Sequence, residues 1–506
     1  MKTISLNTVI RNLGLILIVL TVYSCGDKFF DQQTGVYIEP KDHYQTMNDL
    51  GTSTNGVLTS LKETFPNLIM VDGLRSDMMD VTNNADLNLK AIYNQEFDKT
   101  NPYLDVSGLY KVIINANEVL ANIGRVPESV PDFDEELQHQ YAGFLVCIRS
   151  WAYFQLVRLN GEAAYIPDNL SELPDNLTQL YIPKDAMVDT LINQLLPYIH
   201  TDENIVEYSF SNFPICKAVL GELYLEKNDY DNAITYLKMA MESFQNGTYT
   251  YKVTEEYFKE LWKNIFIGGT SSSTENIGVL VYNATENQVN PLAVWTHPSN
   301  QFVVKPSSVI YDKYMSQVQK NKFVGDIYRG IGVAIDTLEN SSSTYIKKYL
   351  LEESSNGYGE DIPFMRCGDI HLLLAEALNR SGQSDLALIL LNQGVVSEKR
   401  RPRFFMSWSK NLGIRGRAYL ESVTIPSSVT DPNQIIEMVE DYITDERSME
   451  LAFEGYRMFD LMRIAKRRGD PGYLANRVAA KYPAEMQEKV KNYWMNEDHW
   501  YLPIDR

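Results

Sequence analysis

Carboxylate and guanidinium side chains recur at regular steps in "DERSMELAFEGYRMFDLMRIAKRRGD", near the C-terminus of the 506-residue chain. The residues at these steps are Glu446, Glu450, Glu454, Arg457, Asp460 and Arg463. Two carboxylates at a defined separation could act as the acid and base of a glycosidase. Carboxylates stacked four residues apart on a helix, however, repel one another unless cations neutralise them. We therefore interpret the row, together with Arg447, as an ion-pair network rather than a catalytic pair.

Other signals of catalysis are weak. The sequence contains no Walker loop, HExxH, GxSxG, CxxC or calcium-loop motif. Gly330 and Gly332 form a GxG, but they lack the strand and helix context of a nucleotide-binding turn. His371 stands near acidic residues but falls at a core position of a helical pattern, so we predict a structural histidine.

The cysteines and the net charge exclude further classes of site. Cys147, Cys216 and Cys367 are widely spaced within apolar helical patterns, which predicts buried core residues and no disulfide framework or zinc site. The 66 acidic residues outnumber the 46 basic ones, giving a net charge of −20. Such a chain is repelled by phosphate backbones, so we expect no nucleic-acid partner.

The N-terminus has the layout of an export signal. Lys2 and Arg11 precede an apolar run from Leu13 to Tyr23, and this run is too short for the roughly 20 residues of a membrane span. The sequence "VYSC" resembles a bacterial lipobox, in which cleavage before the cysteine exposes it for acylation. We predict that residues 1–24 are removed and that acyl chains on Cys25 hold the protein on a membrane.

The elements that must position any site are predicted to be helices. Apolar residues recur with helical period from Leu109 to Ile123, from about Leu137 to Leu159 and from Met187 to Ile199. Two further segments match the tetratricopeptide spacing, in which small residues let antiparallel helices approach closely. The matching positions are Leu220, Gly221, Tyr224, Ala233, Leu237 and Ala240 in the first segment, and Leu374, Ala375, Leu378, Ala387, Leu391 and Gly394 in the second. Generic helical hairpins are the alternative.

The amino-acid composition changes between these two segments. Residues 268–273 are rich in glycine, serine and threonine, and "ENIGVLVYNA" is typical of a short strand. We predict an irregular, loop-rich insertion over residues 266–360 on a helical scaffold, and loops on a rigid scaffold often carry binding residues.

Motifs along nearly the whole chain resemble the SusD/RagB family of outer-membrane nutrient-binding lipoproteins. They are "CGDKFFD", "LYKVIINANEVL", "GFLVCIRSWAYFQLVRLNG", the hairpin at 216–242, "DIYRG", "IKKYL", "PFMRCGDIHLLLAEALNRSG", "ERSMELAFEGYRMFDLMR" and "YLPI". The resemblance divides the chain into a signal peptide (1–24), an N-terminal helical region with tetratricopeptide-like hairpins (25–265), a ligand-face insertion (266–360) and a C-terminal helical region (361–506).

The resemblance implies an all-α, tetratricopeptide-like superhelix that displays an irregular ligand face. It implies a surface protein that captures oligosaccharides, or in some relatives peptides, for a SusC-like TonB-dependent transporter. It further implies no enzymatic activity and no cofactor. Two departures are Val106, at a position where family members often carry tryptophan, and the chain end at "LPIDR".

Matching by position to the family gives the predicted ligand-binding residues. An N-proximal stretch offers Arg75, Asp77, Tyr93 and Asn94, and the insertion offers Trp295 and, more weakly, Trp262. Aromatic rings can stack on sugar C–H faces while polar side chains bind hydroxyls. Simple packing of each aromatic and a local Arg75–Asp77 salt bridge are the alternatives.

Two other functions compete with glycan capture. A tetratricopeptide adaptor would hold envelope proteins together without a small ligand, and an α-helical enzyme would degrade polysaccharides. The insertion between the repeats favours ligand binding over the adaptor, because an adaptor would more naturally continue uninterrupted repeats. The sequence does not identify the sugar or the transporter.

Overall fold

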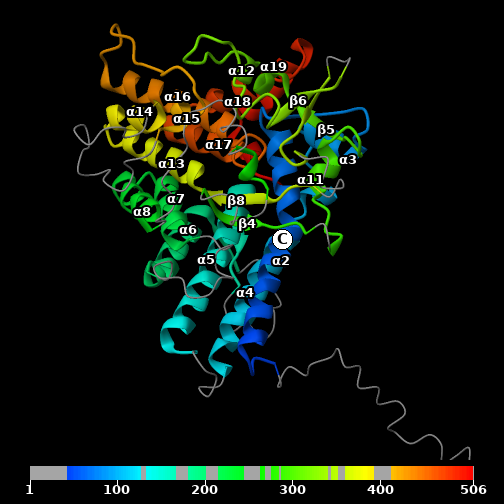
Figure 1. Cartoon of the computed structure of the whole chain (residues 1–506), viewed down its shortest axis with the longest axis vertical. Helices are drawn as coiled ribbons and strands as arrows, with labels where there is room; N and C mark the ends of the chain where they lie inside the picture. Colours follow the sequence, from blue (N-terminus) through cyan, green and yellow to red (C-terminus); the bar gives the residue numbers. More distant parts are fainter. Residues whose placement is uncertain are drawn as a thin grey trace, which may run out of the picture.

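The computed structural model describes residues 43–126, 133–166, 180–200, 215–243, 262–267, 275–283, 286–339, 343–351, 359–392 and 412–504. The predicted signal peptide and Cys25 lie outside this part of the chain. Helices form most of the described structure, and four small two-stranded sheets join them (Figure 1). The predicted all-α architecture is confirmed.

Three long helices form the N-terminal part of the scaffold. They are α2 (Met47–Arg75), α4 (Ser107–Asn122) and α5 (Glu135–Asn160), and α4 packs against both of the others. The periodicity of the sequence predicts α4 and α5 but not α2, which contains Pro66. A capping box marks the start of α2, because the side chains of Thr46 and Asp49 each accept a hydrogen bond from the other residue's backbone N–H.

Two helical hairpins lie at the predicted tetratricopeptide-like segments. The first is α7 (Cys216–Glu226) with α8 (Tyr230–Ser243), and the second is α13 (Cys367–Arg380) with α14 (Ser384–Asn392). The hairpins stack on each other through α8 and α13 on one side of the molecule (Figure 1). The predicted small and large residues are buried apart from Tyr224, which stacks on Tyr236 with 5.4 Å between ring centroids. Gly394 lies outside the described residues.

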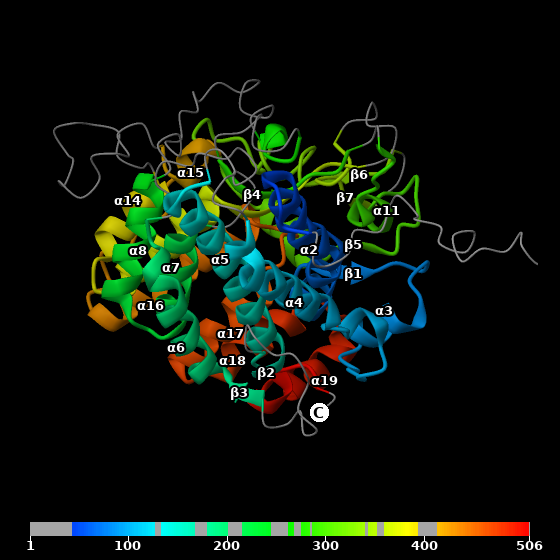
Figure 2. The ribbon, with the colours of Figure 1, turned by 90° about the horizontal axis from the view of Figure 1, so that it is seen from below.

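Other helices complete the scaffold and the insertion. They are α3 (Leu87–Tyr93), α6 (Lys184–Leu195), α11 (Pro291–Thr296), α12 (Ser308–Met315), α15 (Ile414–Arg417), α16 (Pro432–Glu450), α17 (Arg457–Arg468), α18 (Pro471–Ala479) and α19 (Ala484–Trp494), with 3-10 turns η2 (Pro102–Leu104), η3 (Ile123–Arg125), η5 (Leu196–Tyr198) and η11 (Glu497–Trp500). Seen from below, the hairpins lie on one side, and α2, α3 and α11 lie on the other (Figure 2). The part of the insertion around α11 therefore lies away from the hairpins.

All four sheets are antiparallel pairs. They are β1 (Met79–Val81) with β5 (Val304–Pro306), β2 (Glu162–Ala164) with β3 (Tyr181–Pro183), β4 (Asn276–Leu280) with β8 (Ile362–Arg366), and β6 (Ile335–Thr337) with β7 (Thr344–Ile346). The strand β4 confirms the strand predicted at "ENIGVLVYNA". Because β8 leads directly into α13, this pair attaches the start of the insertion to the second hairpin.

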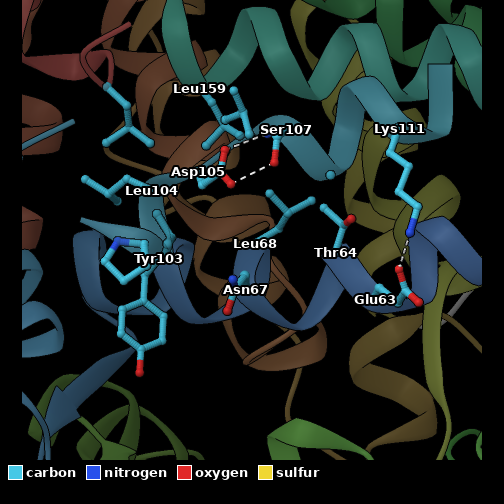
Figure 3. A pocket seen from close by; sticks show the side chains of 15 residues that line it. Glu63, Thr64, Asn67, Leu68, Tyr103, Leu104, Asp105, Ser107, Lys111 and Leu159 are labelled. Atoms are coloured by element: carbon cyan, nitrogen blue, oxygen red, sulfur yellow. Dashed lines mark hydrogen bonds and ion pairs between the residues drawn. The ribbon is translucent and has the colours of Figure 1, made fainter. Parts of the chain in front are cut away.

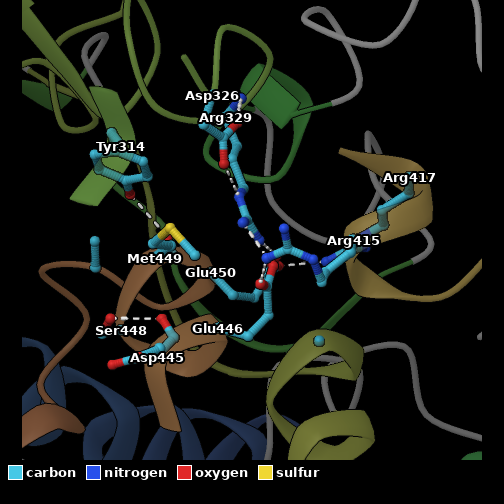
Figure 4. Close-up of polar contacts among 12 residues, drawn as sticks. Tyr314, Asp326, Arg329, Arg415, Arg417, Asp445, Glu446, Ser448, Met449 and Glu450 are labelled. Atoms are coloured by element: carbon cyan, nitrogen blue, oxygen red, sulfur yellow. Dashed lines mark hydrogen bonds and ion pairs between the residues drawn. The ribbon is translucent and has the colours of Figure 1, made fainter. Parts of the chain in front are cut away.

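A buried ion-pair network surrounds the C-terminal end of α16. Glu450 contacts the guanidinium groups of Arg329 and Arg417 (Figure 4). It also contacts that of Arg366. Arg366 also binds Glu454 through two bonds of 2.8 and 3.0 Å. Although burial alone would raise the pKa of Glu450, these arginines lower it to about 2. The predicted neutralisation of the carboxylate row is therefore confirmed.

The arginines that neutralise the glutamates of this row are not those predicted from the sequence. The helix α16 ends at Glu450 and α17 begins at Arg457, so Glu454 lies in the turn between them. The arginines bind Asp460 of the row and carboxylates elsewhere: Arg447 contacts Asp460 and Asp369, Arg463 contacts Asp460 and Glu376, and Arg457 contacts Asp77. Helical spacing predicted that the glutamates are neutralised, but tertiary contacts supply the cations.

The predicted structural roles of His371 and of the three cysteines can be compared with their positions in the fold. His371 is fully buried, its Nε2 lies 2.9 Å from the carbonyl oxygen of Leu390, and burial lowers its pKa to about 4. Cys147, Cys216 and Cys367 are buried as predicted. Among the described residues, no helix combines the length and apolar character needed to cross a membrane.

The close approach of α7 and α8 predicts that Gly221→Ala destabilises the protein. An added Cβ would lie 2.4 Å from Cγ of Leu237, and overpacking of this kind costs about 1–3 kcal/mol. Gly56→Ala is the matched control, because nothing lies within 4 Å of its added Cβ in α2. In urea unfolding, the free energy of unfolding should be lower for Gly221→Ala than for the wild type. For Gly56→Ala it should be unchanged or higher. Equal stability of the two variants would contradict the close packing.

The buried network predicts a large loss of stability for Arg366→Met. The variant leaves Glu450 and Glu454 short of a cation in the interior, which typically costs about 3–5 kcal/mol. Lys111→Met is the control, because its pair with Glu63 is more than half exposed and worth at most about 1 kcal/mol. Denaturant unfolding at neutral pH measures the free energy of unfolding of both variants. If Arg366→Met lowers it no more than Lys111→Met does, the stability of the fold does not depend on this network.

Candidate functional site

The N-proximal stretch and the insertion, from which the ligand-binding residues are predicted, are neighbours in space. Strands β1 and β5 pair them, with Met79 opposite Pro306 and Val81 opposite Val304. The contact continues beyond the strands, because the backbone N–H of Thr82 donates to the carbonyl of Val303 over 2.9 Å. The helix α3 follows β1, and α11 precedes β5, so the two helices flank one small sheet (Figure 2).

Three of the predicted ligand-binding residues are half-buried at this junction. Tyr93 ends α3, with its ring centroid 4.8 Å from that of Tyr482, and Asn94 caps the C-terminus of the same helix. Trp295 lies on α11 and packs partly against the main hydrophobic core. Burial raises the pKa of Tyr93 to about 12, so its phenol is neutral at neutral pH. These three residues have exposed surface that a ligand could reach.

Arg75 and Asp77 are each about 1% exposed, and each has its own structural partner. The Arg75 guanidinium donates to the carbonyl oxygen of Trp500 over 2.5 Å. Asp77 accepts two hydrogen bonds from Arg457, at 2.7 and 2.8 Å. The alternative of a local Arg75–Asp77 salt bridge is therefore wrong, since Asp77 pairs with α17 instead.

Trp262 is also enclosed, with an exposed fraction of 4%. Its ring centroid lies 4.5 Å from the guanidinium carbon of Arg417 and 5.8 Å from that of Arg366. An indole face so close to two guanidinium groups is a favourable cation–π arrangement. In this structure Trp262 covers the buried ion-pair network, and its contacts are internal to the protein.

A cavity of about 220 Å³ opens next to α3, between α2, η2 and the start of α4 (Figure 3). Its polar lining consists of Glu63, Thr64, Asn67, Tyr103, Asp105, Ser107 and Lys111. Asp105 is held in place by hydrogen bonds from the backbone N–H and the hydroxyl of Ser107, at 2.9 and 2.7 Å. The cavity therefore presents a carboxylate, hydroxyls, an amide and an ammonium group on fixed elements.

The turn η2 is connected directly to α3. The Asn101 side chain caps η2 by accepting from the N–H of Tyr103, and it donates to the carbonyl of Asn88 over 2.9 Å. The phenol of Tyr103 donates to the carboxylate of Asp86, the N-cap of α3, over 3.0 Å. The turn that borders the cavity is therefore fixed to the helix that carries Tyr93.

A second cavity of about 230 Å³ lies on the other side of the segment 104–107. Its lining includes Tyr110, Glu162 and Tyr181, and the last described residues of the chain, Pro503 and Ile504, close it. Leu104, Asp105, Val106 and Ser107 line both cavities. The two cavities together form a divided groove with tyrosines on both sides, which we call the η2 groove.

Comparison with known proteins identifies the family. Residues 281–506 match the sequence pattern of the SusD family. Two SusD-like proteins of Formosa agariphila are 22% and 23% identical to this chain, each over 89% of it and over 90% and 89% of their own lengths. Residues 281–506 of the chain belong to the SusD family.

Solved structures share the fold of this SusD-family chain. A SusD superfamily protein from Bacteroides vulgatus superposes with a TM-score of 0.66 at 18% identity, covering 91% of this chain and 96% of its own. A laminarin-binding SusD-like protein superposes with a TM-score of 0.58 at 17% identity, covering 86% of this chain and 95% of its own. At these identities the likeness establishes the shared fold.

The residues of the η2 groove were not among those predicted from the SusD-family pattern. One signal pointed to the place, because Val106, which departs from the family's frequent tryptophan, lines both cavities. A second signal is Gly108, where an added Cβ would lie 2.2 Å from Oγ1 of Thr64. This glycine allows the start of α4 to approach α2 beside the first cavity.

The Asp77–Arg457 pair predicts a stability difference that depends on pH. Although burial alone would raise the pKa of Asp77, the Arg457 guanidinium lowers it to about 2, below the ordinary value of 3.8. A lowered carboxyl pKa stabilises the folded state above the unfolded pKa, and this contribution is lost as the pH falls through the folded pKa.

Asp77→Asn should therefore lower the free energy of unfolding by about 3 kcal/mol at pH 7. The difference from the wild type should shrink as the pH falls from about 4 towards 2. Urea unfolding across this pH range measures it, with Asp498→Asn as the control because Asp498 is exposed. A difference that stays constant with pH would refute the electrostatic origin.

Proposed function

We propose that this SusD-family protein is a cell-surface lipoprotein that binds oligosaccharides or polysaccharides and delivers them to a SusC-like TonB-dependent transporter. The observation that carries the proposal is the η2 groove, which combines tyrosines with fixed hydrogen-bonding groups beside the junction of the N-proximal stretch and the insertion. The existence of a laminarin-binding SusD-like protein with the same fold supports a glycan ligand.

The chemistry of the groove suits a sugar. Burial, together with the hydrogen bond to Asp86, raises the pKa of Tyr103 to about 12, and burial raises that of Tyr110 to about 12. Both phenols are therefore neutral hydroxyl groups at neutral pH. Sugar hydroxyls both donate and accept, so they can bind the Asp105 carboxylate and the Lys111 ammonium at once. The ring of Tyr103 offers an apolar face for sugar C–H groups.

The surroundings of the carboxylates support binding without cleavage. A retaining or inverting glycosidase needs two carboxyl groups facing a shared substrate. The glutamate row near the C-terminus, which raised that alternative, is instead occupied by buried guanidinium groups. In the first cavity, Glu63 pairs with Lys111 over 2.7 Å, and Asp105 accepts from Ser107. The proposal therefore includes no catalytic residue.

The proposed location follows from the N-terminal sequence. Acylation of Cys25 after removal of residues 1–24 would tether the folded body to the outer membrane, and the acidic residues of the chain would favour solution over the anionic membrane surface. Residues 25–42 would connect the tether to α2. The transporter would supply the energy for uptake, so this protein would need no cofactor.

A glycan-binding screen of residues 26–506 tests the proposal. We expect retention on one class of polysaccharide in affinity gels, with Tyr103→Ala and Asp105→Ala each weakening binding about tenfold, because a lost stacking face or charged hydrogen bond is worth about 1–3 kcal/mol. Trp295→Ala, tested in parallel, shows whether the predicted binding residue of α11 also contacts the glycan.

Tyr236→Ala is the matched control, because Tyr236 is a half-buried tyrosine on α8, among the hairpins. If glycan binding is unchanged by both groove substitutions but weakened by Trp295→Ala, the protein binds glycans at α11 and not in the η2 groove. Retention of peptides alone by the folded protein, or of no ligand at all, would refute glycan capture. Release of shorter sugars from the bound polysaccharide would favour the enzyme.

A further inference from the structure

A third cavity of about 530 Å³ is lined by residues of α12 and α16 and by Arg415 of α15. None of the residues that line it belongs to the η2 groove. The residues that matter for its chemistry are Asp312, Lys313, Arg415, Tyr442, Asp445 and Glu446. We call this cavity the α12–α16 cleft.

The charged groups of the cleft are held in fixed positions. The ammonium of Lys313 binds the carboxylate of Asp445 over 2.9 Å and the hydroxyl of Ser448 over 3.1 Å. The Arg415 guanidinium donates to Glu446 over 2.7 Å and to the carbonyl of Glu421 over 2.8 Å. Glu446 is also paired with the buried Arg329, which connects the wall of the cleft to the ion-pair network. Because these side chains are already fixed, little conformational entropy is lost when a ligand binds.

Hydrogen-bonding capacity remains at the cleft after these contacts. A lysine ammonium has three N–H donors and an arginine guanidinium has five. Within the described part of the chain, Lys313 donates to Asp445 and Ser448, and Arg415 donates to Glu446, Glu421 and Gln317, so each retains donor capacity. The side chain of Asp445 is 48% exposed, and Asp312 is exposed beside it.

Apolar groups also line the cleft. They are Val309, Val423, Met449 and the ring of Tyr442. The phenol of Tyr442 donates to the carbonyl of Thr424 over 3.1 Å, which fixes the ring at the edge of the cavity. Tyr442 lies on the same face of α16 as Asp445 and Glu446, so an aromatic ring adjoins hydrogen-bonding groups. A pyranose needs both, because its C–H face is apolar and its rim carries hydroxyls.

The charge balance selects among possible ligands. Three carboxylates line the cleft against two cations, and both cations are already paired. An anionic ligand would meet the surplus carboxylate of Asp312, whereas a hydroxyl can donate to a carboxylate and accept from an ammonium or guanidinium group. The volume lies within the range of roughly 300–1,000 Å³ typical of small-molecule sites.

From these observations we infer that the α12–α16 cleft is a second saccharide site that accepts one or two rings of a neutral sugar. This inference rests on the proposed function, because it extends glycan capture from one surface of the protein to another. The η2 groove and the cleft are built from different helices, so each can be disabled separately.

Hydrogen–deuterium exchange of residues 26–506 tests the inference. The probes are maltose, cellobiose, laminaribiose and diacetylchitobiose at millimolar concentration, with digalacturonic acid as the anionic comparison. We expect a neutral disaccharide to protect peptides covering 309–317 and 442–449. Tyr442→Ala combined with Asp445→Asn should weaken the affinity measured from this protection about tenfold or more. Tyr236→Ala should leave it unchanged, and urea unfolding should confirm that all variants are folded.

The possible outcomes separate the inference from the proposed function. Protection limited to 63–68 and 102–111 would overturn the second site and leave glycan capture intact. Protection of the cleft that the double variant abolishes, with or without protection of the groove, would support the second site. Stronger protection by digalacturonic acid than by any neutral probe would overturn the assigned ligand class. Absence of protection everywhere would overturn both the second site and binding of these sugar classes.

Discussion

The architecture depends on the burial of Arg366 among three carboxylates. This residue ends β8, immediately before the second hairpin. It binds Glu275 from the insertion side, Glu450 at the end of α16 and Glu454 in the turn that follows. A buried guanidinium group is costly unless its donors are satisfied, and here several carboxylate and carbonyl oxygens satisfy them. The insertion, the second hairpin and α16 must all be in place before these charges can be buried.

The same requirement positions the irregular part of the molecule. Arg329 and Lys348 come from the insertion, and both reach carboxylates near the end of α16, Arg329 to Glu450 and Lys348 to Glu454. A loop-rich segment has few backbone hydrogen bonds of its own to hold it, so fixed charges in the interior substitute for regular structure. The β1–β5 pair gives the insertion a second attachment, just after the C-terminal end of α2. The irregular segment is therefore joined to the helical scaffold at two places.

The sequence predicted best what depends on local periodicity. Helical spacing identified α4, α5 and both hairpins, since small residues such as Gly221 have a clear meaning where helices pack. It missed α2, because the apolar residues of that helix are interrupted by polar ones and by Pro66. It also predicted that Glu450 is neutralised but could not name Arg329, Arg366 and Arg417, which come from more than 30 residues away.

The binding residues were harder to predict for a related reason. Arg75, Asp77 and Trp262 have the residue types of a sugar site, but in the structure their polar groups and ring face contact partners inside the protein. Residue type alone does not reveal burial, because a buried arginine and a ligand-binding one need the same donors. Whether Tyr93, Asn94 and Trp295 contact a ligand stays a prediction. The η2 groove is formed by a short turn and two helix edges, which carry no periodic signal.

The last described residues of the chain have a further consequence. The N–H of Leu502 donates to the carbonyl of Leu159 over 2.7 Å, and the side chain of Asn160 donates to the carbonyl of Leu502, so the tail is attached to the end of α5. Leu502, Pro503 and Ile504 then close the two cavities of the η2 groove. The groove can therefore be complete only after residues 502–504 have been synthesised, 342 residues after Asn160, to which the tail is attached.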